Sequence, residues 1–296
     1  MFGRRIDGRR IKGIDPIVQI TPYLMPMRCD AQVFLQHRVD LDKMNRYIRK
    51  LKTERGEVIS HMQLFIAAYV RSVSKNPDVN RFISNKRFYS RNNLSCAFTI
   101  LKNPGDYSAG EAVVKLKFDP YDTLFDVRDR FNAAVEAERQ AEPSNVSNKL
   151  ASAVLKVPGL PTLLVAIVKF LDRHDMCPKV LINDLPFYVG AYITNTASIG
   201  LHHVNHHIYN FGNVGMFFSL GTTEHVAEAT EEGTVTKRYL PIGIVVDERV
   251  CAGAYYAKFF ADMNYYLNNP EALEIPPESV KFDKGCEYSE PKVNKQ

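Results

Sequence analysis

The chain has 296 residues, 45% of them hydrophobic and 24% charged, which is enough to bury one large core. The net charge of +5 is spread along the sequence except at its start, which argues against a nucleic-acid-binding protein. Five cysteines without CxxC spacing argue against a disulfide framework or a zinc site. The N-terminus lacks the apolar stretch of a signal peptide. We therefore expect a reduced, cytoplasmic protein.

The two ends of the chain differ from its middle. Residues 1–19 open with the basic run Gly3–Gly13, which has no helical periodicity and predicts a loosely ordered arm. Residues 276–296 are polar and rich in Pro, Glu and Lys, which predicts a mobile tail. The domain itself is therefore expected over residues 20–275.

Strand and helix patterns alternate through this domain. Residues 33–39 alternate like a strand, and Asp40 then caps a helix with apolar residues from Leu41 to Leu51. A second helix runs from Met62 to Val73 and ends before Asn76-Pro77. Two strands are predicted at 94–101 and 112–118, joined by the turn-rich residues 103–106, and a further helix opens at Asp122. Three later strands are predicted at 188–195, 214–220 and 239–247. This order, with no internal repeat, predicts one α/β domain with a mixed sheet and helices packed on it.

The most informative segment lies where the last strand meets the last helix. It reads Val246-Asp247-Glu248-Arg249-Val250-Cys251-Ala252-Gly253. It resembles the His-x-x-x-Asp-Gly signature of chloramphenicol acetyltransferase and of the catalytic domains of 2-oxo-acid dehydrogenase acyltransferases. The Gly is kept as Gly253, whereas Glu248 stands at the His position and Ala252 at the Asp position.

Other segments resemble the same superfamily. They are Tyr23–Ala31, Phe65–Val70, Asn76–Phe82, the Ile193-Thr194-Asn195 loop with Gly200, and Asn268–Leu273. Together they cover residues 20–275 and are most similar to stand-alone members without a lipoyl domain. The resemblance implies an α/β, chloramphenicol acetyltransferase-like two-layer fold with a mixed β-sheet and packed helices. It also implies a homotrimer or an assembly of trimers, and an N-terminal arm that reaches a neighbouring subunit.

The chemistry implied by the resemblance is acyl transfer from a thioester, with coenzyme A or acyl-CoA as substrate and no metal. In such enzymes the base and the hydroxyl that stabilises the oxyanion come from adjacent subunits; Glu248 stands at the base position and Thr194, followed by Asn195, at the hydroxyl position. A carboxylate has a reference pKa about two units below that of imidazole, so Glu248 is a poor base unless burial raises its pKa. The sequence leaves open weak or redirected acyl transfer, retained ordinary acyl transfer, and a non-catalytic trimeric scaffold or regulatory binding protein. Glu248 could also be only a polar strand end. Cys251 is a further candidate nucleophile.

A histidine cluster occupies residues 202–207. His202/His206 and His203/His207 are spaced i, i+4, which on a helix would suit a metal, but the cluster lies between Gly200 and a predicted strand, where the family has a loop. The alternatives are structural histidines, a metal site, or a proton-transfer role for His206 or His207 in place of the missing motif histidine.

The segment from Val154 to Leu171 is strongly apolar and follows a polar loop at 142–149. Its two prolines and two lysines leave no uncharged run long enough to cross a bilayer. Residues Leu160–Leu171 are predicted to form either a buried or inter-subunit helix, or an exposed helix that lies on a membrane surface or closes over an acyl chain.

Overall fold

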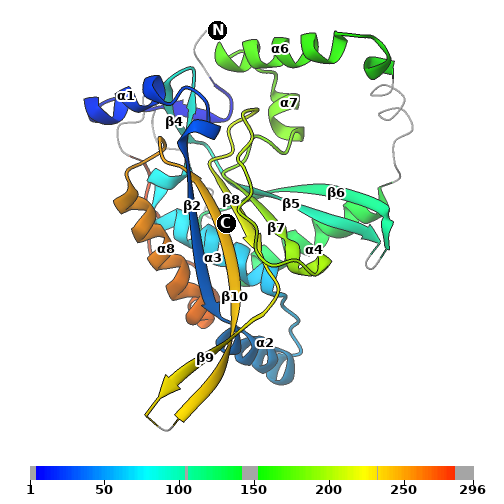
Figure 1. Cartoon of the computed structure of the whole chain (residues 1–296), viewed down its shortest axis with the longest axis vertical. Helices are drawn as coiled ribbons and strands as arrows, with labels where there is room; N and C mark the ends of the chain where they lie inside the picture. The colour runs from blue at the N-terminus through cyan, green and yellow to red at the C-terminus, as the bar shows by residue number, and fades with distance from the viewer. Residues whose placement is uncertain (1–4, 104–105, 142–152, 232, 284–296) are drawn as a thin grey trace.

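A seven-stranded mixed sheet runs through the middle of the molecule (Figure 1). The computed structural model describes residues 5–103, 106–141, 153–231 and 233–283. The strand order is β2-β10-β8-β7-β5-β6, and β9 pairs with the first half of β10. Strand β7 is parallel to both β5 and β8, and the other pairings are antiparallel. The strands of this sheet are β2 (Gln32–Asp40), β5 (Leu94–Asn103), β6 (Asp106–Phe118), β7 (Ala191–Asn195), β8 (Met216–Leu220), β9 (Glu224–Thr230) and β10 (Gly233–Asp247).

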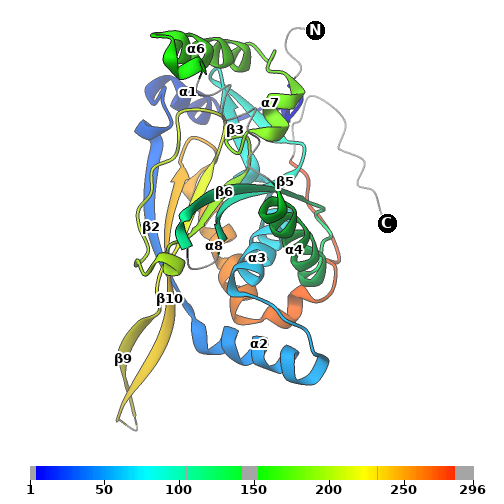
Figure 2. The ribbon, with the colours of Figure 1, turned by 90° about the vertical axis from the view of Figure 1, so that its right-hand side faces the viewer.

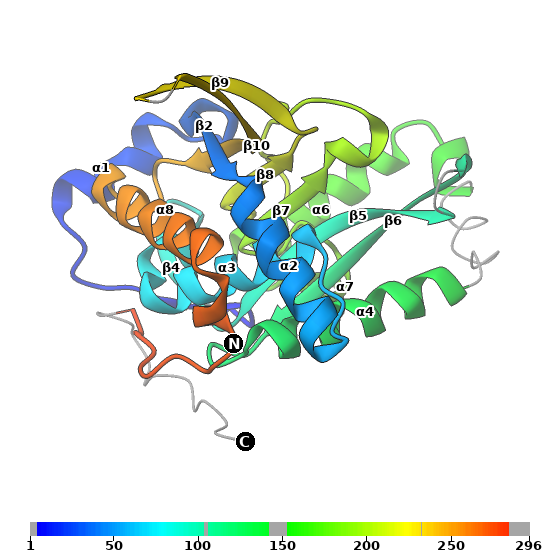
Figure 3. The same cartoon turned by 90° about the horizontal axis from the view of Figure 1, so that it is seen from below.

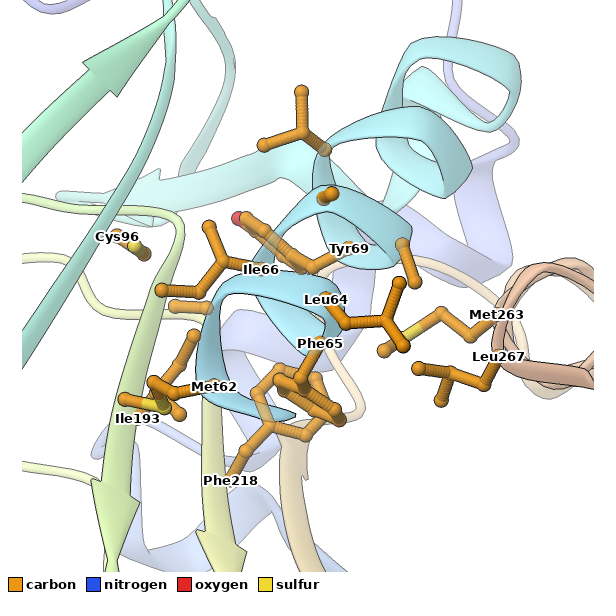
Figure 4. Close-up of a cluster of buried hydrophobic side chains, with 14 of the residues drawn as sticks. Met62, Leu64, Phe65, Ile66, Tyr69, Cys96, Ile193, Phe218, Met263 and Leu267 are labelled. Atoms are coloured by element: carbon orange, nitrogen blue, oxygen red, sulfur yellow. The ribbon is translucent and has the colours of Figure 1, made fainter. Parts of the chain in front are cut away.

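One face of the sheet is covered by helices, as Figure 2 shows from the side. These are α2 (Leu41–Arg55), α3 (His61–Lys75), α4 (Leu124–Gln140) and α8 (Gly253–Asn268). Helix α3 lies against the sheet with α8 beside it, and the rings of Phe65 and Phe218 meet edge to face at 5.3 Å (Figure 4). The predicted two-layer α/β architecture is confirmed, because the main core lies between this sheet and these helices.

Local capping explains where the helices begin. The Asp40 carboxylate accepts a hydrogen bond from the Lys43 amide, as predicted for α2, and Ser60 forms a capping box at α3. Helix α4 begins one residue later than predicted, because Thr123 rather than Asp122 is its N-cap. The residues around Pro104 and the loop at 142–149 lie outside the described residues.

The other face of the sheet is covered by a loop. Residues 201–215 cross it without regular secondary structure, and Ile208 packs in a second small core with Tyr192, Phe217 and Val245. Figure 3 shows α2, α3, α4 and α8 on the side of the sheet away from β9.

The remaining elements gather at one end of the molecule, which is uppermost in Figures 1 and 2. They are a three-stranded sheet and three helices: β1 (Gly8–Arg10), β3 (Arg81–Ser84), β4 (Arg87–Arg91), α1 (Pro16–Leu24), α6 (Leu160–Arg173) and α7 (Lys179–Asp184). Single turns of 3-10 helix occur at Cys29–Ala31, Pro77–Asn80, Thr196–Ile199 and Pro270–Leu273.

Both ends of the described chain are better packed than the sequence predicted. Strand β1 pairs with β4, and Arg5 is buried with its guanidinium on Asp7 at 2.9 Å, so residues 5–11 are not a loose arm. The buried Asp283 carboxylate pairs with Arg81 at 2.5–2.6 Å, which anchors the C-terminal segment as far as residue 283.

The apolar residues from Leu160 onward form α6, and no residue of this helix is buried. The expectation of a core helix is therefore wrong within a single chain, whereas an inter-subunit helix, a helix on a membrane surface and a helix that closes over an acyl chain stay predictions. Within the described residues, no helix combines the length and the apolar character that crossing a bilayer requires.

Candidate active site

Charged side chains lie at the end of β10 and in the turn that follows it. Asp247, the last residue of the strand, and Arg249 in the turn are buried, whereas Glu248 between them is exposed. The Asp247 carboxylate accepts two hydrogen bonds from Arg249, from Nε at 2.8 Å and from Nη2 at 2.7 Å. The Arg28 Nε lies 3.5 Å from the same carboxylate. One buried acid therefore holds two buried cations.

These two arginines join distant segments to the strand–helix junction. Arg28 donates to the carbonyl oxygens of Tyr209 at 2.5 Å and Gly212 at 3.0 Å, and Arg249 donates to that of Met25 at 2.9 Å. Burial lowers the pKa of Arg28, and the nearby Asp247 carboxylate opposes that shift. The network fixes the junction between β10 and α8 relative to the residues after α1 and to the loop of residues 201–215, which we call the histidine loop.

Glu248 makes only a backbone contact. Its amide donates to the carbonyl of Ala31 at 2.9 Å, and its exposed carboxylate has no hydrogen bond or ion pair with the residues that the structure describes. Four residues on, Ala252 is the N-cap of α8 and offers no side-chain acceptor to the helix amides. Both replaced positions of the motif thus lie at the surface of the single chain.

Thr194 and Asn195 end β7, far from Glu248. Thr194 is paired with Ser219 of β8, which is paired in turn with Gly243 of β10. Gly243 and the last strand residue, Asp247, are four residues apart along β10, which at ~3.3 Å per residue corresponds to about 13 Å, and Glu248 follows in the turn. One chain therefore does not bring the predicted base and the predicted hydroxyl together. Asn195 is exposed beyond Thr194.

The histidine cluster is a loop, as the resemblance implied, and not a helix. The ring of His206 stacks on Phe217 at 4.0 Å with the planes nearly parallel, and its Nδ1 lies 2.8 Å from the carbonyl oxygen of His207. Phe217 is paired with Val245, three residues before Glu248, so His206 sits about 10 Å along the sheet from that residue. No group of three metal-ligating side chains occurs among the described residues.

Two glycines let this loop lie directly on the sheet. A Cβ at Gly221 would come within 2.2 Å of the His203 amide nitrogen, and one at Gly243 within 2.4 Å of the Val204 carbonyl oxygen. The Val204 amide then donates to the Ser219 hydroxyl at 3.0 Å. Gly243 within β10 and Gly221 directly after β8 were the sequence signal for this close approach, which the motifs alone did not reveal.

Solved structures share this arrangement of strands and helices at low sequence identity. A probable dihydrolipoamide acetyltransferase from Listeria monocytogenes superimposes with a TM-score of 0.55 at 13% identity, over 87% of this chain and 94% of that one. A chloramphenicol acetyltransferase gives a TM-score of 0.54 at 10% identity, over 88% of this chain and 99% of that one. The chain has the chloramphenicol acetyltransferase-like fold. The cubic core of the pyruvate dehydrogenase multienzyme complex also shares it, with a TM-score of 0.53 at 13% identity over 89% of this chain and 93% of that one. Neither protein-family models nor curated protein sequences match the chain.

Within the chloramphenicol acetyltransferase-like fold, Cys251 is placed for packing. It is 3% exposed, and burial raises its pKa to about 12, so at neutral pH it is a thiol and not the thiolate that a nucleophile requires. Cys29, Cys96, Cys177 and Cys251 are all free thiols, and Cys286 lies outside the described residues.

The sequence motifs did not reveal the charge network around Asp247. The sequence signal for this network was Asp247 and Arg249, an acidic and a basic residue two positions apart at the end of an apolar strand. That spacing alone does not tell which side chains point into the protein. The chloramphenicol acetyltransferase-like fold supplies the missing fact, since it places Arg28 beside them from a segment more than two hundred residues away.

Proposed function

We propose that the chain is a trimeric, acyltransferase-like protein that binds an acyl thioester such as acyl-CoA at a site shared between neighbouring copies. The observation that carries the proposal is the separation of Thr194 from Glu248 along the sheet of one chain. The two side chains can serve one reaction only if Glu248 of one copy meets Thr194 of the next. Closed rotational symmetry repeats such a contact in every copy.

In this site Glu248 would accept the proton of the attacking thiol or hydroxyl, and the Thr194 hydroxyl would donate to the oxyanion of the tetrahedral intermediate. Among the residues that the structure describes, the exposed Glu248 carboxylate has no ion-pair partner, which leaves it available to a substrate. Its low intrinsic basicity supports weak or redirected transfer rather than the reaction of a histidine enzyme.

A non-catalytic trimeric scaffold or regulatory binding protein is the second candidate. It is favoured by Ala252, which leaves α8 without a side-chain cap, and by His206, which is stacked on Phe217 about 10 Å along the sheet from Glu248. Neither observation supplies a replacement for the motif histidine.

The decisive experiment measures CoA and acyl-CoA binding, and then acyl transfer, for the full chain and Glu248→Gln. We expect binding to persist and transfer to fall by ~10²-fold, because Gln keeps the shape but cannot take the proton. Glu54→Gln, a change of another exposed carboxylate on α2, is the matched control. If His206→Ala or His207→Ala abolishes transfer while Glu248→Gln does not, the base is in the histidine loop.

Absence of transfer with every acyl-CoA tested would favour the scaffold. The double variant Glu248→His/Ala252→Asp then tests whether the pocket survives, because it restores both motif residues. Assembly is tested separately by light scattering. A stable monomer at micromolar concentration would rule out the shared site.

A further inference from the structure

Helices α1 and α6 lie at one end of the molecule (Figures 1 and 2). Both helices expose large apolar side chains there. Both helices line one cavity of about 730 Å³, α1 through Pro22 and α6 through Ala166, Lys169 and Phe170. We call this end the α1–α6 face. It lies opposite α2, which is at the bottom of the same views.

Helix α6 turns an apolar stripe away from the protein. Leu163, Ile167 and Phe170 are spaced i, i+4, i+7 and so share one side of the helix, and they are 56%, 45% and 56% exposed. The inner side is held by Val168, which packs in a small core, and by Asp172, which accepts from Arg5 at 2.8 Å. No residue of α6 is buried, although Phe170 also lines the shared cavity and its ring lies 4.4 Å from that of His174.

Helix α1 repeats the pattern. Ile17, Ile20 and Leu24 are spaced i, i+3, i+7, and they are 78%, 51% and 71% exposed. Tyr23 is also exposed, and its ring carries the Lys86 ammonium at 4.4 Å. Two neighbouring helices thus present apolar residues to the outside.

Cations surround these stripes. Lys86, Lys169 and Arg173 line the shared cavity, and none of the three has an ion-pair partner within the described residues. The one acid in that lining, Asp172, is already paired with Arg5. A second cavity of about 840 Å³ on the other side of α1 adds Arg10 and Arg87 and has no acidic lining residue.

We propose that the α1–α6 face docks on the surface of a membrane rich in anionic phospholipid. The apolar stripes enter the headgroup boundary, and the surrounding cations attract the negative lipid phosphates. A second copy of the chain fits less well, because a symmetric contact through this face would bring like charges together. This role is separate from thioester binding and does not depend on it.

The test is co-sedimentation of the full chain with phosphatidylcholine vesicles, with and without phosphatidylglycerol. We expect binding only to the anionic vesicles and weakening at high salt, because surface charge is screened. Lys169→Glu/Arg173→Glu should lower the vesicle affinity by about tenfold or more. The matched control, Lys50→Glu/Lys52→Glu, makes the same charge change on α2 and should leave binding unchanged.

A second variant separates insertion from attraction. Leu163→Asp/Phe170→Asp should abolish vesicle binding while keeping the oligomeric state and the circular dichroism spectrum of the parent. Val58→Asp/Val235→Asp, at exposed valines outside this face, is its control. Three results would overturn the proposal: no sedimentation with anionic vesicles, equal binding to neutral ones, or an α6 variant that changes the assembly instead of the vesicle affinity.

Discussion

Helices α3 and α6 have similar lengths and apolar character but opposite environments. Thirteen of the fifteen residues of α3 are buried, and none of the fourteen of α6 is. Helix α3 lies between the sheet and α4 and α8, so even its polar side chains are enclosed: Arg71 donates to two carbonyl oxygens and Ser74 to one. The comparison teaches that an apolar run predicts a helix, whereas its burial depends on elements far away in the sequence.

The largest expected effect comes from the same change in both helices. Leu64→Asp/Ile66→Asp in α3 should abolish cooperative folding, because two unpaired charges would be buried. Leu164→Asp/Ile167→Asp in α6 should change the free energy of unfolding by less than ~0.5 kcal/mol, since both side chains are partly exposed. Urea unfolding followed by circular dichroism measures both. Equal losses would mean that α6 is buried in solution, for example between subunits.

Asp247→Asn extends the comparison to buried charged groups, because it removes the carboxylate that two buried arginines share. It leaves Arg28 and Arg249 enclosed without their carboxylate, so we expect a loss of about 3–5 kcal/mol in the free energy of unfolding. The exposed Glu248→Gln next to it should cost little by the same chemical denaturation measurement. A near-neutral Asp247→Asn would mean that water reaches the network.

Gly243→Ala tests how tightly the histidine loop packs on the face of the sheet that it covers. The added methyl would meet the Val204 carbonyl oxygen at 2.4 Å, so the loop must shift at a cost of about 1–3 kcal/mol. Gly253→Ala is the control, because a Cβ there would meet no atom within 4 Å. Thermal unfolding of the two variants should separate them.

The dependence of stability on pH involves Asp7, whose partner Arg5 also ties α6 to the N-terminal segment. Burial alone would raise the pKa of Asp7, but the Arg5 guanidinium more than offsets it and holds that pKa below its ordinary value. Asp7 therefore stabilises the fold above its unfolded pKa of about 3.9, and this stability is lost as the pH falls through the lower folded value. Asp7→Asn should flatten the acid limb of a stability–pH curve. If the acid limb of the curve is the same for Asp7→Asn and the parent, other carboxylates cause the loss of stability at low pH.

The sequence predicted the parts of the fold that depend on local pattern. Helix α3 and strand β2 were found from periodicity, and the junction at Gly253 from its motif. The predictions failed where distant residues decide: β1 pairs with β4 across some eighty residues of sequence, and Asp283 is fixed by Arg81. The candidate site residues were named from the motif, but the distance between Thr194 and Glu248 followed only from the register of three strands.

The histidine loop has a consequence for the motions of the protein. It has no helix or strand, yet the Ile208 amide donates to the Gln32 side chain at 2.6 Å and Arg28 holds the carbonyls of Tyr209 and Gly212. A segment fixed in this way opens rarely, so its amide protons should exchange with solvent as slowly as those of a strand. Hydrogen exchange would then show that this loop, although it has no regular secondary structure, is protected from solvent exchange like the sheet beneath it.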